Sequence, residues 1–280
     1  MGRSREPIDL RRQPAQSLFP WYRLLEQLPA PPLNFEELFP VSQPVELEVG
    51  SGRGLFLMNA AMLQPHINFL GIECDLKEAR RAARRVQKRN LQNARMIGGD
   101  ARRLIAHYLP TGCLSAVHVY FPDPWWKRRH RKRRIFCPTF VAEVARLLRP
   151  GGSLHSWTDV EEYFGQIRKL VNQSPVLAEQ PPPDEKAPRH DMDYHTSFER
   201  KKRQAGLPIY RAQWLRNDQP APPPAVPFDL PLKPEWQPHA QPFDSAGMDL
   251  DDPDLDDDEL EDDDELEDDD IDADDQDRDD

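Results

Sequence analysis

The chain has 280 residues and a formal net charge of −12, but the charge is distributed unevenly. Residues 249–280 hold 23 Asp or Glu residues and one Arg, a charge of −22, so residues 1–248 carry +10. A basic body beside an acidic end is typical of a nucleic-acid-binding protein.

Two further properties exclude whole classes of protein. No apolar run is long enough to span a bilayer, and the N-terminus is polar and Arg-rich, without the apolar stretch of a signal peptide. We therefore expect a cytoplasmic protein without membrane contact. The three cysteines, Cys74, Cys113 and Cys137, form no CxxC pair, so we expect neither a disulfide framework nor a metal site.

Composition predicts four regions. Residues 1–33 are polar, basic and dotted with proline, which predicts a flexible N-terminal arm with a short helix near residues 21–25. We expect a single folded domain over residues 34–216. A proline-rich linker over 217–248 and a disordered acidic tail over 249–280 follow, because neither segment can bury a core.

Apolar segments of strand length alternate with helical segments in the expected domain. Strands are predicted at 45–49, 68–73, 94–98, 114–120, 153–157 and 208–214, and helices at 55–63, 76–90, 138–148, 160–171 and from 196 onward. A proline-rich connection is expected over 173–190. The alternation predicts an α/β domain on a mostly parallel sheet with right-handed crossovers.

A glycine-rich turn follows the first predicted strand. Gly50, Gly52 and Gly54 would let a ligand approach the backbone near the start of the next helix. The same pattern suits NAD, FAD or a bare tight turn. Glu73 follows about 20 residues later, at a distance where a carboxylate can accept ribose hydroxyls.

Acidic residues lie in or just after five successive strands: Glu48, Glu73, Asp100, Asp123 and Asp159. Parallel strands would bring these side chains to one edge of the sheet, where ligands bind in open α/β folds. The alternative is that they cap the helices that follow, and this alternative is strongest for Asp100 and Asp159.

Residues 121–135 form the most distinctive stretch. Pro122 and Pro124 stiffen a turn that displays Asp123, and two tryptophans and a dense basic run follow. An acid on a rigid turn, flat aromatic rings and a phosphate-binding run predict a site for a nucleic-acid base. In the alternative interpretation, the prolines are ordinary loop residues, the tryptophans belong to the hydrophobic core, and the basic run is a face exposed to solvent.

Two further segments fit either function or structure. The predicted helix over 76–90 has a basic face, formed by Lys77, Arg80, Arg81, Arg84, Arg85, Lys88 and Arg89. This face suits contact with phosphates and simple exposure to solvent equally well. Thr196 and Glu199 have the spacing of a capping box at the start of the last helix.

Taken together, these residues resemble the bacterial tRNA (guanine-N7-)-methyltransferase family of the TrmB type over roughly residues 41–216. The strongest match is residues 121–125 with Lys127 and 133–135; residues 48–54, 71–73, 100–101, 158–159 and 196–199 match further motifs. The resemblance implies a Rossmann-like class I methyltransferase fold, with a mostly parallel seven-stranded sheet and helices on both faces.

The resemblance also implies an activity and a set of site residues. S-adenosylmethionine would be the cofactor, and its methyl group would pass to N7 of a guanine in the tRNA variable loop (position 46), without a metal. The expected cofactor residues are Glu48, Gly50, Gly52, Glu73, Asp100 and Asp123, with Asp123 also catalytic. The expected substrate contacts are Lys127, Asp159, Thr196, Ser197, Phe198 and Glu199, and the expected phosphate contacts are Arg128, Arg129, Arg131, Lys132, Arg133 and Arg134.

Three other functions are compatible with parts of the sequence. Asp123-Pro124-Trp125 faintly resembles the acid-Pro-Pro-aromatic motif of amino-group methyltransferases, although the order of residues departs from it. The glycines and Glu73 alone would suit a nicotinamide dehydrogenase, but no hydride-site pair is evident. A non-catalytic RNA-binding protein on a methyltransferase fold is the third, and the intact set of cofactor residues argues against it.

Overall fold

The computed structural model describes residues 18–182 and 194–225, which belong to one compact unit. The expected acidic tail, residues 1–17 of the expected arm and most of the expected linker lie outside the described residues. Within the part that is described, no helix has the length and apolar character needed to cross a membrane.

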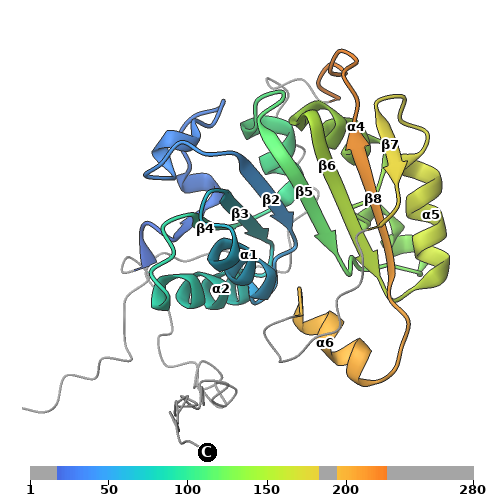
Figure 1. The fold of residues 1–280 in the computed structure, drawn as a ribbon, viewed down its shortest axis with the longest axis horizontal. Coiled ribbons are helices and arrows are strands. Elements are labelled where there is room, and N and C mark those ends of the chain that lie inside the picture. The colour runs from blue at the N-terminus through green and yellow to red at the C-terminus, as the bar shows by residue number, and fades with distance from the viewer. Residues whose placement is uncertain (1–17, 183–193, 226–280) are drawn as a thin grey trace, which may run out of the picture. The chain divides into compact units, whose positions relative to one another are not determined.

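A single eight-stranded sheet forms the centre of the described structure (Figure 1). From one edge to the other its strands are β1 (Tyr22–Leu24), β4 (Ala94–Gly98), β3 (Asn68–Glu73), β2 (Val45–Val49), β5 (Leu114–Tyr120), β6 (Leu148–Thr158), β8 (Tyr210–Arg216) and β7 (Leu177–Gln180). The strands from β1 to β6 in this order are parallel, and β8 is antiparallel to both of its neighbours. The expected mostly parallel α/β sheet is therefore confirmed, with eight strands instead of seven.

Both edge strands correct the expectations from the sequence. The short helix expected at residues 21–25 is wrong, because Tyr22–Leu24 pairs with β4 and a 3-10 turn, η2 (Leu25–Gln27), follows. The ordered part of the chain therefore begins before residue 33. At the other edge, β7 lies inside the proline-rich connection expected over 173–190. Strands of three and four residues have too few residues for an apolar pattern to reveal them in the sequence. They are recognised only when their pairing partners are known.

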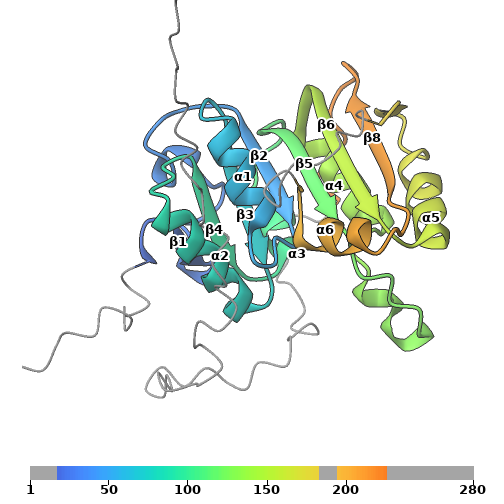
Figure 2. The same cartoon turned by 60° about the horizontal axis from the view of Figure 1, so that its bottom comes forward.

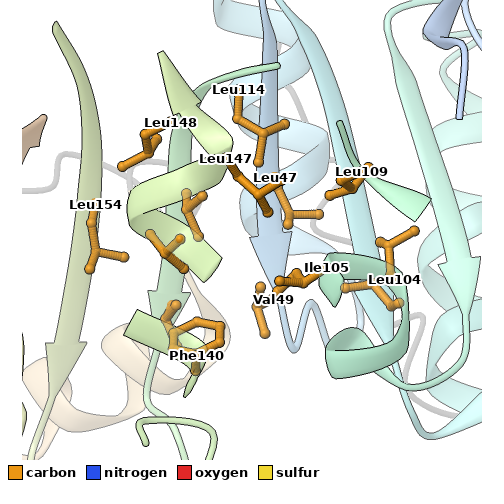
Figure 3. Close-up of a cluster of buried hydrophobic side chains, with 14 of the residues drawn as sticks. Leu47, Val49, Leu104, Ile105, Leu109, Leu114, Phe140, Leu147, Leu148 and Leu154 are labelled. Carbon is orange, nitrogen blue, oxygen red and sulfur yellow. The ribbon is translucent and has the colours of Figure 1, made fainter. Parts of the chain in front are cut away.

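Helices cover both faces of the sheet (Figures 1 and 2). One face carries α1 (Leu55–Leu63) and α2 (Leu76–Lys88), and the other carries α4 (Pro138–Leu147) and α5 (Glu161–Val171). Adjacent β3 residues show the division, since Phe69 packs in the cluster with α1 and α2 whereas Leu70 packs in the opposite cluster. Figure 3 shows the larger cluster, where Leu47 and Val49 of β2 meet Phe140 and Leu147 of α4.

The remaining short elements lie in the loops. They are η3 (Phe35–Glu37), α3 (Ala101–Arg103), η4 (Leu104–Tyr108), which is a π-helix, η5 (Arg128–Arg133) and α6 (Ser197–Gln204). In Figure 1, α6 lies beyond the arrowheads of β5 and β6, which are the carboxyl ends of those strands. The loops that follow the parallel strands and α6 therefore share one edge of the sheet.

The strand order reverses between β2 and β5. These neighbours pair in parallel, with Glu48 opposite His118, yet β3 and β4 continue to one side and β6 to the other. A reversal of this kind leaves a crevice at the carboxyl ends of the two strands, because the connections leave on opposite faces. The topology thus places the turn after β2 beside the turn after β5.

Gly54 sets how closely the turn after β2 approaches α2. Its φ is +74°, and a Cβ placed on it would lie 2.6 Å from the Cβ of Ala82. Only glycine combines a positive φ with so close a contact at low cost. The glycine therefore serves helix packing as well as the turn.

We predict that Gly54→Ala destabilises the fold more than Gly112→Ala does. Gly112 has a similar φ of +68°, but a Cβ added there would meet nothing within 4 Å, so its variant reports backbone strain alone. That strain costs about 1–2 kcal/mol, and overpacking against Ala82 should add about 1–3 kcal/mol. Urea unfolding of both variants measures the difference, and equal losses would contradict the packing role.

Candidate active site

The glycine turn after β2 presents open backbone at the carboxyl edge. The amides of Gly50 and Ser51 both donate to the carbonyl of Ile72, at 2.9 and 3.2 Å, which ties the turn to β3. Gly50 and Gly52 have φ values of +78° and +51°, and a Cβ on either would meet nothing within 4 Å. The turn is therefore fixed in position while its outer side stays accessible to a ligand.

Glu73 joins the ends of β2 and β3. Its Oε2 accepts from the amide of Gly52 at 2.9 Å, and its Oε1 accepts from the amide of Asp75 at 2.9 Å. The N-cap of α2 is Asp75, whose Oδ1 accepts from the amides of Lys77 and Glu78. Glu73 therefore does not cap α2. It lies beside the glycine turn, which is the position expected for an acid that binds a cofactor.

Glu48 is a buried acid with an oxygen that lacks a protein partner. It is 4% exposed, and its Oε2 has no hydrogen-bond partner within the described part of the chain. Burial, reinforced by the charge of Glu73, raises the pKa of Glu48 to about 8, against the opposing effect of a hydrogen bond from Ser51. A buried carboxyl with one unpartnered oxygen, beside an open turn, is suited to a cationic ligand group.

The capping alternative proves right for one of the two acids for which it was strongest. Asp100 is the N-cap of α3, with its Oδ1 accepting from the amide of Arg102 at 2.8 Å. Asp159 is not a cap, because Val160 occupies that position in α5. Its carboxylate instead pairs with Lys202 of α6 at 2.8 Å. Asp159 therefore fixes α6 against the end of β6.

Asp123 lies on a strained turn after β5. The residues on either side of Pro122-Asp123-Pro124, Phe121 and Trp125, have φ values of +49° and +40°. Positive φ in a bulky aromatic residue costs about 1–3 kcal/mol and is concentrated at functional sites. Asp123 is among the exposed residues, yet partial burial of its carboxyl and the charge of Glu73 raise its pKa. The acid therefore lies within electrostatic reach of Glu73.

Thr196 is the N-cap of α6, in line with the structural alternative, but Glu199 accepts from the amide one residue before the cap and completes no full capping box. Thr196 Oγ1 accepts from the amide of Glu199 at 2.9 Å, and Glu199 Oε2 accepts from the amide of His195 at 2.6 Å. Glu199 is buried and pairs with Arg203. Burial disfavours its charge, but the hydrogen bonds from His195 and the charge of Arg203 outweigh burial and lower its pKa.

An exposed aromatic residue connects α6 to the Asp123 turn. Phe198 is 61% exposed, and its ring stacks against that of Phe121 with centroids 6.0 Å apart and planes 24° apart. Ser197, the first residue of α6, lies beside it and is half-buried. The structure thus gathers Asp159, the start of α6 and the Asp123 turn at the carboxyl ends of β5 and β6.

The basic run forms a turn that projects from the body (green in Figure 2). Its exposed members are Lys127, Arg128, Arg129, Arg131 and Lys132. Arg133 stacks over Trp125, with Cζ 5.1 Å from the ring centre, and Arg134 points back into the protein. The alternative that made both tryptophans core is wrong, since Trp126 is 42% exposed and Trp125 is half-buried.

The basic face of α2 lies near two other sources of positive charge. The apolar stripe is fully buried, with Ala79, Ala82, Ala83 and Val86 each at 0% exposure. Burial lowers the pKa of Arg85, and the charges of Arg53, Arg89 and Arg200 lower it further. Glu78 pairs with both Arg53 and Arg81. Arginines from α2, the glycine turn and α6 are therefore concentrated on one surface.

Several site residues could not be recognised in the sequence. Ser51 Oγ donates to the main-chain carbonyl of the buried Glu48, and Lys202 pairs with Asp159, but serine and lysine at these positions give no local signal. Phe121 opens the distinctive stretch, yet its positive φ and its contact with Phe198 appear only in three dimensions. The run of glycines and acids marked the site, whereas its supporting residues needed the fold.

Comparison with known proteins is consistent with this geometry. A family model described as a putative methyltransferase matches residues 42–212. The chain is 45% identical over 204 residues to the tRNA (guanine-N(7)-)-methyltransferase of Rhodopirellula baltica, which covers 71% of this chain and 75% of that protein. Proteins of the same name from Cupriavidus necator and Alkalilimnicola ehrlichii are 40% and 35% identical, over 61% and 70% of this chain and 65% and 83% of their own lengths.

We predict that Glu48 makes the ligand-free protein less stable as pH rises. Its folded pKa of about 8 lies above its ordinary value of 4.5, so between these values the unfolded chain binds fewer protons than the folded one. Stability should fall through this window by up to about 1.4 kcal/mol per pH unit from this group. Urea unfolding between about pH 5 and pH 8 should show a flatter profile for Glu48→Gln, while exposed Glu36→Gln serves as the control. Identical profiles for wild type and Glu48→Gln would contradict the shift.

Proposed function

Because this chain belongs to the bacterial tRNA (guanine-N7-)-methyltransferase family of the TrmB type, we propose that the guanine it methylates lies in the tRNA variable loop, at position 46. The enzyme transfers a methyl group from S-adenosylmethionine to N7 of a guanine in tRNA. One observation supports the placement of this chemistry above the others. The glycine turn, to which Glu73 is hydrogen-bonded, follows β2, and Asp123 follows the neighbouring strand β5 where the strand order reverses.

The proposed cofactor site consists of the strand ends from β2 to β5. S-adenosylmethionine supplies a methyl carbon made electrophilic by its sulfonium. The open backbone of Gly50 and Gly52 can lie against the cofactor, and Glu73 has lone pairs left for ribose hydroxyls after accepting from Gly52. Asp100 lies at the end of β4 and keeps one carboxylate oxygen beyond its capping bond.

Oε2 of Glu48, which has no hydrogen-bond partner in the described structure, shows whether the site suits a cationic cofactor. A buried acid with an unsatisfied oxygen costs free energy in the ligand-free protein. S-adenosylmethionine carries an ammonium group and a sulfonium, and either positive charge near Glu48 would favour its ionised form. The residues present therefore fit the cofactor, with Glu48 as the acid that balances its charge.

Asp123 is the proposed catalytic residue. Guanine N7 already carries a lone pair, so methyl transfer needs alignment of N7 with the methyl carbon more than it needs a strong base. The purine gains positive charge as the bond forms, and a nearby carboxylate stabilises that charge. Asp123 could act in this way, or it could accept from the guanine N1–H and N2–H groups and hold the base.

The proposed tRNA contacts surround this acid. The exposed side chains of the basic turn are placed to meet phosphates, and the arginine-rich surface of α2 extends the positive region. Asp159, Thr196, Ser197, Phe198 and Glu199 would form the substrate side of the site. The capping and ion-pair roles of Thr196, Glu199 and Asp159 mean that they would act chiefly by fixing the position of α6.

The proposed position is tested by nucleoside analysis. Unmodified tRNA is incubated with the protein and labelled S-adenosylmethionine, and the label should appear in 7-methylguanosine. Replacing the guanine at position 46 by adenine should abolish it. Persistent 7-methylguanosine would contradict the variable-loop position, and label on an exocyclic amino group would indicate an amino-group methyltransferase. Cofactor binding without any transfer would indicate a non-catalytic RNA-binding protein.

We predict that Asp123→Ala slows methyl transfer by about 10²–10³-fold, the usual cost of removing one electrostatic stabiliser. Single-turnover rates at saturating tRNA measure the effect, and calorimetry checks that the cofactor still binds. Asp123→Asn separates the two proposed tasks, because it loses the charge but keeps an acceptor oxygen. It should match the alanine variant if the acid stabilises charge and recover part of the rate if it holds the base. A wild-type rate in Asp123→Ala would exclude both.

A further inference from the structure

Arg134 differs from the rest of the basic run because its guanidinium points into the protein. We propose that Arg134 is a positioning residue that fixes the Asp123 turn for catalysis and is not a contact to tRNA phosphate. The proposal rests on the proposed function, since it assigns Arg134 a part in the methyl-transfer site. It also revises the expectation that every arginine of the run serves the RNA backbone.

Two directed hydrogen bonds hold the Arg134 side chain in place. Its Nε donates to the carbonyl oxygen of Pro124 at 2.6 Å, directly after Asp123 in the chain. One of its terminal nitrogens donates to Oε1 of Gln166 in α5 at 2.8 Å. Gln166 in turn donates to Glu162 at 3.2 Å, which orients its amide. The turn is thereby joined to a helix that packs on the core.

Aromatic rings on two sides complete the site around the guanidinium. Its Cζ lies 5.3 Å from the ring centre of Trp126 and 5.2 Å from that of Tyr163. Tyr163 is 2% exposed, so this contact is with the core of the protein. A planar guanidinium can stack on rings and donate in its own plane at once, which a lysine ammonium cannot do.

The Asp123 turn needs such an external anchor. The last ladder bond of this segment is from the amide of Phe121 to the carbonyl of Trp157, at 2.8 Å. Pro122 and Pro124 have no amide hydrogen to donate, so the backbone on both sides of Asp123 cannot be held by its own N–H groups. The positive φ values of Phe121 and Trp125 add strain. A bond to the Pro124 carbonyl restrains the turn where it would otherwise relax.

A second arginine ties the basic turn, and not the Asp123 turn itself, to the end of β4. Arg102 donates to the carbonyls of Lys132 and Arg134, at 3.1 and 2.6 Å. The amide of Arg102 also donates to the capping oxygen of Asp100. The basic turn is therefore connected to the strand ends that carry Asp100 and Asp123. Phosphates held by its exposed side chains would then lie at a fixed position relative to Asp123.

The test uses two variants and a matched control. Arg134→Lys keeps the charge but loses the two directed bonds, and Gln166→Ala removes one of those bonds without changing any charge. Arg149→Lys makes the same chemical change at an exposed position outside the proposed site. Single-turnover rates are measured at saturating tRNA, and tRNA affinity is measured over a series of salt concentrations. Hydrogen exchange is measured without ligand across residues 121–134, which include both the Asp123 turn and the basic turn.

We expect Arg134→Lys to slow methyl transfer between about tenfold and a hundredfold, the cost of a misplaced reacting group. Gln166→Ala should give part of that loss, and Arg149→Lys should leave the rate unchanged. tRNA affinity and its salt dependence should stay within about twofold for both Arg134→Lys and Gln166→Ala, because no phosphate contact is removed. Hydrogen exchange in the Asp123 turn and the basic turn should rise in both Arg134→Lys and Gln166→Ala.

Two results would overturn the assignment. One is an unchanged rate and unchanged exchange in both Arg134→Lys and Gln166→Ala. The other is a loss confined to tRNA affinity in Arg134→Lys, with a normal rate at saturation, which would mark Arg134 as a phosphate contact. Failure of the wild type to methylate tRNA would count against the proposed function, whereas the exchange measurement would still decide whether Arg134 anchors the turn.

Discussion

The hydrogen bond from the Gly52 amide to the Glu73 carboxylate is the interaction on which the site depends. It joins the turns after β2 and β3. Burial is the main cause of the raised pKa values of Glu48 and Asp123, and the negative charge of Glu73 adds to both. Glycine is required on the donor side because Gly52 has a φ of +51°. One carboxylate therefore fixes the shape of the turn and the electrostatics of its surroundings.

The site separates negative and positive charge over a short distance. The ends of β2 and β3 carry the acids Glu48, which is buried, and Glu73, which accepts backbone hydrogen bonds. The basic turn and the exposed face of α2 are rich in arginine. A cationic cofactor is complementary to the first region and a polyanionic RNA to the second.

Rigidity around Asp123 comes from outside the turn that carries it. Two prolines remove backbone donors, and two aromatic residues adopt positive φ. The compensating contacts come from the stacking of Phe121 on Phe198 and from the bond of Arg134 to the Pro124 carbonyl, while Arg102 holds the backbone of Arg134. Phe198 belongs to α6 and Arg102 to α3, so the turn that carries Asp123 is held with help from elements far apart in the sequence.

The sequence alone determined the features that depend on local pattern. Strands at 45–49, 68–73, 94–98 and 114–120 and the helix at 55–63 have their expected bounds, because apolar periodicity and glycine act over a few residues. The N-cap role of Thr196 is equally local. Tertiary structure decided the rest. Strand β1 forms only because it can pair with the edge of β4, and Asp159 pairs with Lys202 from a distant helix. Arg134 points toward the body of the protein because Pro124 and Gln166 accept its hydrogen bonds and Trp126 stacks on it. A basic run looks the same in the sequence whether its side chains face solvent or core, since the difference lies in partners that only folding brings near.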